Sequence, residues 1–272
     1  MLVCYSGASS QAYSLEQDIA AAATAGFPAL EIWGPKLGPY LERHSVQDLA
    51  AQLHARHLRP AAIDFIAIDL SREEPLAGAM ADLRRYGEVA TAIDCHLLLL
   101  IVVGRRPELS KEQALNYLAK LMLPLCDAAG RYGLRLALEP LGRDPLIPGP
   151  REAMEIIRIS RRDNLGIALD LFHFYKSGLR LDEARLIPPE RLYIVHVADA
   201  PPRDPAVLKD TDRLWPGEGV IPLDDYLEVL RDLRFDGPIS VEVPNKTYAL
   251  MDPDTLAREA FESLEEFLTL RV

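Results

Sequence analysis

The sequence has little cysteine: three residues, Cys4, Cys95 and Cys126, occur among 272. They are far apart, odd in number and form no Cys-x-x-Cys pair. This pattern argues against a disulfide framework and a thiolate metal cluster, and it is typical of a reduced protein. The first ten residues contain no basic side chain, so we expect no export signal and predict a cytoplasmic location.

Positive charge and long apolar runs are also scarce. Lys and Arg total 30 against 41 Asp and Glu, which gives a net charge of −11. An acidic surface repels phosphate backbones and anionic lipids, so we expect no nucleic-acid partner. No apolar run approaches the roughly 18 residues that a membrane span needs, so we expect no membrane partner either.

The sequence does contain a regular alternation of strand-like and helix-like segments. Short apolar runs predict strands at residues 2–6, 28–32, 59–66, 96–103, 134–139, 165–170, 192–197 and 238–243. Apolar residues spaced by three and four predict amphipathic helices at residues 15–25, 46–56, 75–92, 111–131, 151–160, 223–233 and 253–270. The segment after Asp170 has only a short helical pattern, so the sixth unit is expected to be abbreviated.

This alternation predicts the fold class. Strands this apolar must be covered on both faces, which favours parallel over antiparallel pairing. About eight strand-then-helix units fit a closed barrel better than an open sheet. We therefore predict an α/β protein with a (β/α)₈ TIM barrel, in which residues 1–272 form a single domain. Ser45 and Ser110 are placed as N-caps of two of its helices.

Four residues with metal-binding side chains stand at or next to strand ends. Glu139 ends LRLALE, Asp170 ends LGIALD, His196 lies in LYIVHV and Glu242 lies in PISVEV. Because the carboxyl ends of barrel strands converge, we expect these side chains to meet. Three carboxylates and one imidazole suit one divalent metal ion, namely Mn²⁺, Co²⁺ or Mg²⁺, and they can also hold Zn²⁺. The structural alternatives are internal ion pairs, a helix cap and an ordinary core histidine.

Such a metal site predicts enolisation chemistry. Three carboxylates neutralise a divalent ion and leave positions for two substrate oxygens, which acidifies the C–H next to a carbonyl and stabilises the resulting enediolate. Glu139 and Glu242 are the predicted catalytic residues. A glutamate on each side of the substrate can remove a proton from one carbon and return one to a neighbouring carbon or face. The sequence does not say which glutamate starts.

Two polar residues that follow the strand ends are candidates for substrate binding. His173 follows Asp170 by three residues and either donates a hydrogen bond to the substrate or packs between two phenylalanines. Asp199 follows His196 by three residues and either orients that imidazole or lines the pocket. Both remain alternatives at the level of the sequence.

The loop LWPGEG is a further candidate for the substrate pocket. Arg213 and Trp215 lie in or beside it and form either a rim or lid over the pocket or ordinary packing. No Gly-rich phosphate site follows the last two predicted strands, so a non-phosphorylated sugar or polyol ketone is the predicted substrate. Weaker candidates for the pocket wall are Glu31, Trp33, His44 and Asp64.

The same motifs resemble a known family. The run EP at 139–140, D-x-x-H at 170–173, H-x-x-D at 196–199, PGEG at 216–219 and DGPISVE at 236–242 resemble the xylose isomerase-like barrel superfamily, often called sugar phosphate isomerases/epimerases. RYGLRLALEPLG, NLGIALDLFHFYKSG and KDTDRLWPGEGVIPLD look most similar to inosose (2-keto-myo-inositol) isomerases. The resemblance covers nearly the whole chain. It implies a barrel with one divalent metal on Glu139, Asp170, His196 and Glu242, the glutamates as acid/base pair, and substrate contact by His173.

The predicted function is therefore a divalent-metal-dependent isomerase or epimerase of an α-hydroxy ketone sugar or cyclic polyol. The resemblance favours an inosose isomerase that acts through a metal-bound enediolate. Ketose 3-epimerases, inosose or dehydroshikimate dehydratases and 3-keto-glycoside lyases begin with the same enolisation, so these alternatives stay open. The predicted partner is a small-molecule ketose or inosose, and a homo-oligomer is also left open.

Two functions of other classes are compatible with a barrel. A metal-dependent abasic-site endonuclease needs several metals and more histidines than the six present, two of which lie on a predicted surface helix. The net charge of −11 also argues against it. A non-catalytic sugar-binding or accessory subunit is the stronger alternative, because some barrel proteins need a partner chain to complete the pocket.

Overall fold

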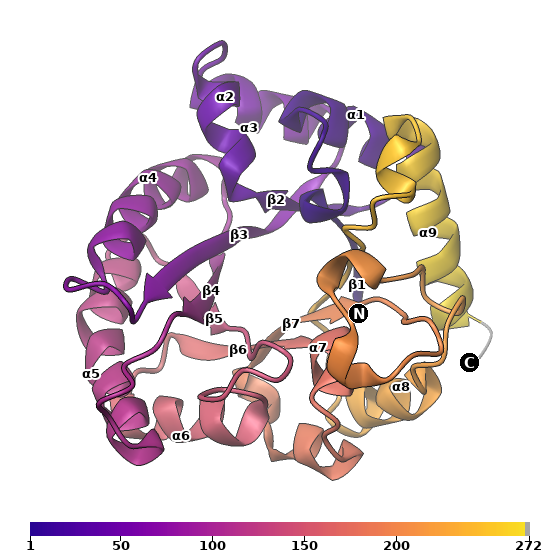
Figure 1. The fold of residues 1–272 in the computed structure, drawn as a ribbon. Helices are drawn as coiled ribbons and strands as arrows, with labels where there is room; N and C mark the ends of the chain where they lie inside the picture. Colours follow the sequence, from indigo (N-terminus) through magenta and orange to yellow (C-terminus); the bar gives the residue numbers. More distant parts are fainter. Residues whose placement is uncertain (270–272) are drawn as a thin grey trace.

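The computed structural model describes residues 1–269 and shows a closed ring of parallel strands surrounded by helices (Figure 1). The strands are β1 (Leu2–Ser6), β2 (Ala29–Trp33), β3 (Arg59–Asp69), β4 (Leu97–Val103), β5 (Arg135–Leu138), β6 (Leu165–Asp170), β7 (Leu192–Val197) and β8 (Pro238–Val241). They pair in chain order, and β8 closes the ring against β1 with Ile239 opposite Val3. The predicted (β/α)₈ barrel is confirmed.

The helices form the outer layer of this barrel (Figure 1). They are α1 (Leu15–Ala25), α2 (Leu37–Leu41), α3 (Val46–Ala55), α4 (Ala77–Ile93), α5 (Lys111–Gly130), α6 (Pro150–Ser160), α7 (Leu171–Lys176), α8 (Leu223–Asp232) and α9 (Pro253–Thr269). The last helix packs against α1, and its Phe261 meets Phe27, which follows α1, edge to face with ring centroids 5.0 Å apart. None of the helices in residues 1–269 is both long and apolar enough to cross a membrane.

The boundaries of several elements differ from those predicted. The sixth unit is short, as expected: α7 has six residues and is followed by two 3₁₀ helices, Leu181–Leu186 and Pro189–Arg191. Strands β5 and β8 end one residue before Glu139 and Glu242, because these carboxylates sit where the backbone leaves the sheet. Strand β3 runs on to Asp69, past the predicted end at residue 66. Leu270, the predicted end of the last helix, lies outside the described residues.

Local sequence signals set where several helices begin. Ser110 Oγ accepts a hydrogen bond from the Gln113 N–H at 3.2 Å, and Gln113 Oε1 accepts one from the Ser110 N–H at 2.9 Å. Ser45 makes the equivalent pair of contacts with Asp48 at the start of α3. Each pair satisfies two backbone donors that a helix leaves free, so both predicted N-caps are confirmed.

The barrel interior depends on strand alternation. In β4, Leu98 and Leu100 pack outward against the helices, whereas Leu97 and Leu99 point into the barrel with small residues of the neighbouring strands. This inner cluster consists of Ala62, Leu97, Leu99, Ala137, Ala168, Tyr193 and Ile194. It closes the lower part of the barrel, so a polar site can form only above it, at the carboxyl ends of the strands.

We expect Leu99→Ala to lower the free energy of unfolding by about 2–5 kcal/mol, because Leu99 is fully buried in this plug and its removal leaves a cavity. Urea unfolding followed by circular dichroism measures the change. Leu186→Ala, at a position that is 44% exposed, is the control and should change stability by less than about 0.5 kcal/mol. Equal effects of the two substitutions would contradict a closed apolar plug in the barrel.

Candidate active site

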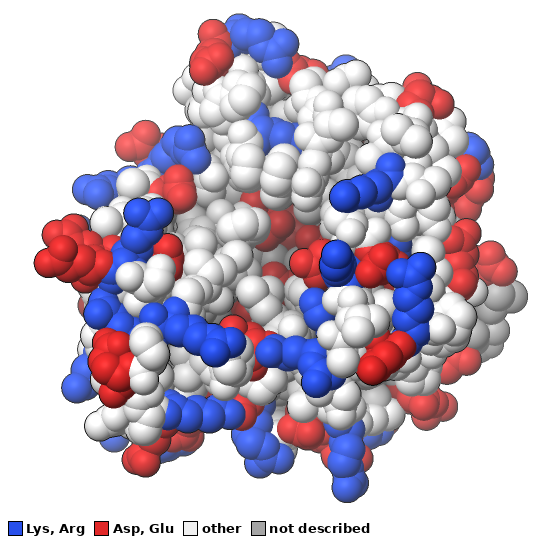
Figure 2. Space-filling model, in the orientation of Figure 1, with Lys and Arg blue, Asp and Glu red and all other residues white. Residues whose placement is uncertain are grey.

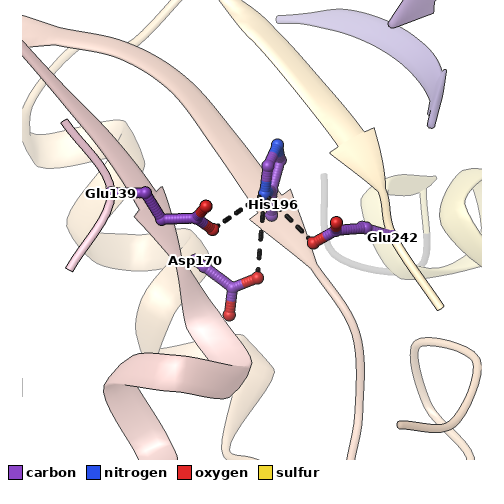
Figure 3. Close-up of side chains that lie close together, drawn as sticks. All are labelled: Glu139, Asp170, His196 and Glu242. Carbon is purple, nitrogen blue, oxygen red and sulfur yellow. Dashed lines mark hydrogen bonds and ion pairs between the residues drawn. The ribbon is translucent and has the colours of Figure 1, made fainter. Parts of the chain in front are cut away.

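The four predicted metal ligands meet at the carboxyl ends of β5 to β8 (Figure 3). Successive residues of a strand face opposite sides, so residues two positions apart face the same side. The residues two positions before the four ligands face the barrel interior or are buried, namely Ala137, Ala168, Ile194 and Ser240. The ligands therefore face inward as well. Pairing aligns them further, with Asp170 opposite His196 and His196 opposite Ser240. One oxygen or nitrogen from each of Glu139, Asp170, His196 and Glu242 lies within 4.8 Å of all the others.

His196 is the centre of this cluster (Figure 3). Its Nδ1 lies 3.2 Å from Glu139 Oε1, 3.2 Å from Glu242 Oε2 and 3.7 Å from Asp170 Oδ2. Burial by itself lowers the pKa of His196, but the carboxylates of Glu31, Glu242 and Glu139 together raise it well above its usual value. Nδ1 is thus the ring nitrogen that faces the other three residues of the cluster.

Glu31 holds the other side of the imidazole. Its Oε1 lies 3.0 Å from His196 Nε2, and its Oε2 accepts a hydrogen bond from Ser240 Oγ at 2.6 Å. A carboxylate at Nε2 fixes the ring orientation and leaves Nδ1 as the metal-binding nitrogen. Glu31 was predicted only as part of the pocket wall. The sequence signal for its role is an acid within the apolar strand ALEIW, which is the same signal that identified Glu242 as a metal ligand.

Arg213 connects the carboxylates to the cavity wall. Its Nη1 lies 2.5 Å from Asp170 Oδ2 and 3.1 Å from Glu242 Oε2, and its guanidinium lies 4.7 Å above the Phe172 ring. Burial raises the pKa of Glu242, but Arg213 and His196 outweigh it and hold that pKa well below its usual value. The pKa of Glu139 is raised, mainly by burial. The two glutamates therefore have different electrostatic surroundings.

A cavity of about 260 Å³ opens above the cluster. It is lined by Ala8, Gln11, Trp33, Asp64, Phe65, Ile101, Glu139, Leu141, His173, Asp210, Arg213, Glu242 and Pro244. Figure 2 shows a hollow near the centre of this face with acidic side chains inside it and basic side chains around the rim. The predicted wall residues Trp33 and Asp64 do line this cavity, and so do His173 and Arg213.

His173 lines the cavity and has one ring nitrogen without a hydrogen-bond partner among residues 1–269. Arg213 Nη2 donates to His173 Nε2 at 3.3 Å, and since arginine has no acceptor, the imidazole proton belongs on Nδ1. That nitrogen is buried and has no hydrogen-bond partner in residues 1–269. The nearest carboxylate, from Asp210, lies 3.8 Å away. His173 thus lines the cavity and also packs beside Phe172, with ring centroids 6.1 Å apart, and its contact with a substrate stays a prediction.

The prediction for Asp199 is corrected. Its Oδ2 accepts hydrogen bonds from the N–H groups of Gly217 and Gly219, and its Oδ1 accepts those of Ile221 and Ala200, at 2.8 to 3.1 Å. The carboxylate is thus committed to holding the 215–221 loop rather than to His196 or a substrate. Glu31 orients His196 in its place.

Two other predicted pocket residues also lie elsewhere. Trp215 stacks on Tyr248 with ring centroids 4.6 Å apart and lines a separate cavity between its loop and α9, so ordinary packing replaces the predicted contact with substrate. His44 lies 3.1 Å from Glu16 Oε1 on the side of α1 and α2. Sequence spacing alone does not exclude Trp215 and His44 from the site. Both come after strands that lead to it, and only the path of the loop after each strand takes them elsewhere.

The donor set fits a divalent metal ion. Three carboxylate oxygens and one imidazole nitrogen are hard or borderline ligands, and they lie close together on residues of which three are buried and Glu242 is partly buried. The Glu31 contact supplies the outer carboxylate that usually accompanies a metal-bound histidine. Glu139, Asp170, His196 and Glu242 are therefore the residues that would hold such an ion.

A parallel barrel with ionisable side chains gathered at the carboxyl ends of its strands defines the class of protein, an α/β-barrel enzyme. A family model described as "Xylose isomerase-like TIM barrel" matches residues 19–267, so the chain belongs to that family. The resemblance inferred from the motifs is thereby confirmed.

Relatives of known name are similar over most of the chain. An inosose isomerase of Bacillus velezensis is 27% identical over 97% of this chain and 96% of its own length. A 3-dehydroshikimate dehydratase of Pseudomonas putida is 26% identical over 95% of this chain and 41% of its own length. A crystal structure of IOLI protein with a binding zinc atom has a TM-score of 0.92 at 25% identity, covering 100% of this chain and 99% of that one. These relatives confirm the prediction of an enzyme.

We expect Glu31→Gln to weaken Mn²⁺ binding about 10- to 100-fold, because the amide no longer orients and charges the His196 ring as the carboxylate does. Isothermal titration calorimetry of metal-free protein measures the affinity. Glu88→Gln, on the exposed face of α4, is the matched control. An unchanged affinity in Glu31→Gln would show that His196 does not depend on its partner.

Proposed function

We propose that this protein is a divalent-metal-dependent isomerase of a small α-hydroxy ketone, and that its substrate is an inosose, a cyclic polyol ketone. The observation that carries the proposal is the pair of glutamates, buried Glu139 and partly buried Glu242, on either side of His196 (Figure 3). With Asp170 and His196 they would hold one Mn²⁺, Co²⁺, Mg²⁺ or Zn²⁺ ion. Such an ion supplies charge neutralisation and orientation of adjacent carbonyl and hydroxyl oxygens.

The two glutamates give the site a proton acceptor at one carbon and a donor at the next. Isomerisation takes a proton from the carbon that bears the hydroxyl and returns one to the former carbonyl carbon through a cis-enediolate, while the hydroxyl proton passes to the former carbonyl oxygen. Glu139, which follows β5, and Glu242, which follows β8, reach the cavity from different sides. Either one can start, and the opposite one completes the transfer.

The cavity supports a substrate of one ring. Its volume of about 260 Å³ lies just below the usual range for drug-sized ligands, so it suits a single sugar or cyclitol rather than an oligosaccharide. His173 and Arg213 line the cavity, so their N–H groups would be the donors for substrate oxygens. The similarity to an inosose isomerase over 97% of the chain supports the choice of a cyclic polyol.

The state of the cysteines agrees with a metabolic enzyme in the cytoplasm. The three cysteines are free and buried, which supports the reducing location that we propose. The proposed partner is the small-molecule ketose itself.

We expect Glu139→Gln and Glu242→Gln each to lower the rate of α-proton exchange by about 10²–10⁴-fold, because an amide can neither accept nor return the carbon-bound proton. The measurement is loss of the α-proton NMR signal of scyllo-inosose and a panel of other ketoses in D₂O, with Mn²⁺-loaded protein. Glu88→Gln is the control. Absence of exchange with every ketose in the wild type would refute the isomerase and favour an accessory or sugar-binding role.

We expect removal of divalent metal with EDTA to abolish exchange and to lower Tm, because an ion that binds only the folded state stabilises it. The stabilisation is about 2.7 kcal/mol when the metal is present at a hundred times its Kd. Differential scanning calorimetry and exchange assays with Mn²⁺, Co²⁺, Mg²⁺ and Zn²⁺ returned one at a time would rank the metals. A Tm and exchange rate indifferent to EDTA would contradict the metal site.

A dehydratase is the second candidate function. The similarity to a 3-dehydroshikimate dehydratase over 95% of the chain favours it, and elimination of water can follow the same proton abstraction. Product analysis separates the two reactions, because an isomer retains the mass of the substrate and a dehydrated product loses one water.

A further inference from the structure

Asp64 is a buried acid on the wall of the active-site cavity. Asp64 is 3% exposed, and it lines the cavity beside Trp33, Phe65 and Ile101. None of the hydrogen bonds within residues 1–269 involves its carboxyl group, in contrast to Glu31, Glu139, Asp170 and Glu242. Burying an unpaired carboxyl is unfavourable, so packing alone does not account for this residue.

The backbone of β3 is irregular at this position. Ile63 lies opposite Leu98 and Ile66 lies opposite Leu100, so three steps on β3 match two on β4. Successive residues of a regular strand face opposite sides, but here Asp64 and Phe65 both line the cavity. Such bulges often re-aim a side chain next to an active site. The irregularity therefore brings Asp64 to the cavity in addition to Phe65.

The carboxyl group of Asp64 matches the hydrogen-bonding chemistry of an alcohol. Carboxyl oxygens accept hydrogen bonds whether or not the group is ionised. A ring hydroxyl group donates one hydrogen bond and accepts others, so a hydroxyl in the cavity would supply the partner that Asp64 lacks among residues 1–269.

We propose that Asp64 binds the substrate directly, through hydrogen bonds between its carboxyl group and a hydroxyl group on the ring. The residue would then select polyol ketones that carry a hydroxyl at the position facing the β2–β3 wall. This inference rests on the proposed function, because it assigns a contact within the same cavity. It names a specificity residue in addition to the metal ligands, His173 and Arg213.

The test compares Asp64→Leu and Asp64→Asn with the wild type in the Mn²⁺-loaded protein. We expect Asp64→Leu to raise the KM for scyllo-inosose about tenfold or more, because the substrate hydroxyl loses its partner. Asp64→Asn, which keeps a donor and an acceptor, should recover part of this loss. Asp69→Asn is the control, because Asp69 lies on the same strand but bonds Ser71 and Arg72 outside the cavity.

Thermal stability separates substrate binding from a structural role. Because an unpaired buried carboxyl opposes folding, we expect Tm in the Asp64 variants to be equal to or higher than that of the wild type, with metal content unchanged. A panel of deoxy-inososes should include one that the wild type and Asp64→Leu bind with equal affinity. A lowered Tm with unchanged KM would overturn the proposal in favour of a structural role.

Direct binding distinguishes failure of this inference from failure of the proposed function. Calorimetric titration of the same ketoses gives a Kd with or without turnover. If wild-type protein binds scyllo-inosose but exchanges no proton, the isomerase is refuted while the Kd ratio of Asp64→Leu to wild type still decides the contact. If the wild type binds and turns over the ketose and the Asp64 variants match it in both, the contact is refuted and the isomerase stands. If the wild type binds none of them, both are refuted.

Discussion

The acidic side chains of this active site repel one another, and the arrangement of the site depends on how that repulsion is offset. Glu139, Asp170 and Glu242 bring their oxygens within 4.8 Å of one another at the end of an apolar barrel. Charges so placed are unfavourable unless positive groups lie among them. Arg213 supplies part of that compensation within the chain, and a divalent ion held by Glu139, Asp170, His196 and Glu242 would supply the rest. The rigid strands prevent the acids from moving apart into water.

Residues around this cluster fix the orientation of its side chains. Below it, Glu31 and Ser240 set the orientation of the His196 ring. Above it, Asp199 binds the backbone of the 215–221 loop, and its own backbone pairs with Leu214. That pairing holds the segment on which Arg213 reaches Asp170 and Glu242. A residue expected to touch substrate thus acts on the site through the loop that carries the arginine.

Isomerisation, epimerisation and dehydration of an α-hydroxy ketone share one initial chemical step, removal of a proton next to a carbonyl, and the surrounding wall decides which reaction is completed. Glu139 and Glu242 face the space from separate strands, which suits transfer between carbons. His173, Arg213 and Asp64 offer different hydrogen-bonding groups at the edge of the same small cavity. Differences at such wall positions, rather than at the metal ligands, are where isomerase, epimerase and dehydratase activities can diverge on one barrel.

The sequence by itself determined the order of strands and helices, the capping of α3 and α5, the short sixth unit and the three carboxylates that meet around His196. Each of these follows from periodicity or from a polar residue at the end of an apolar run, which are properties of local segments. Only the tertiary structure decided that Glu31 supports His196, that Asp199 and Trp215 belong to loop packing, and that Asp64 enters the cavity. Those outcomes depend on strand register, on a bulge between Ile63 and Ile66 and on the path of a long loop, and each of these is settled by contacts between distant segments.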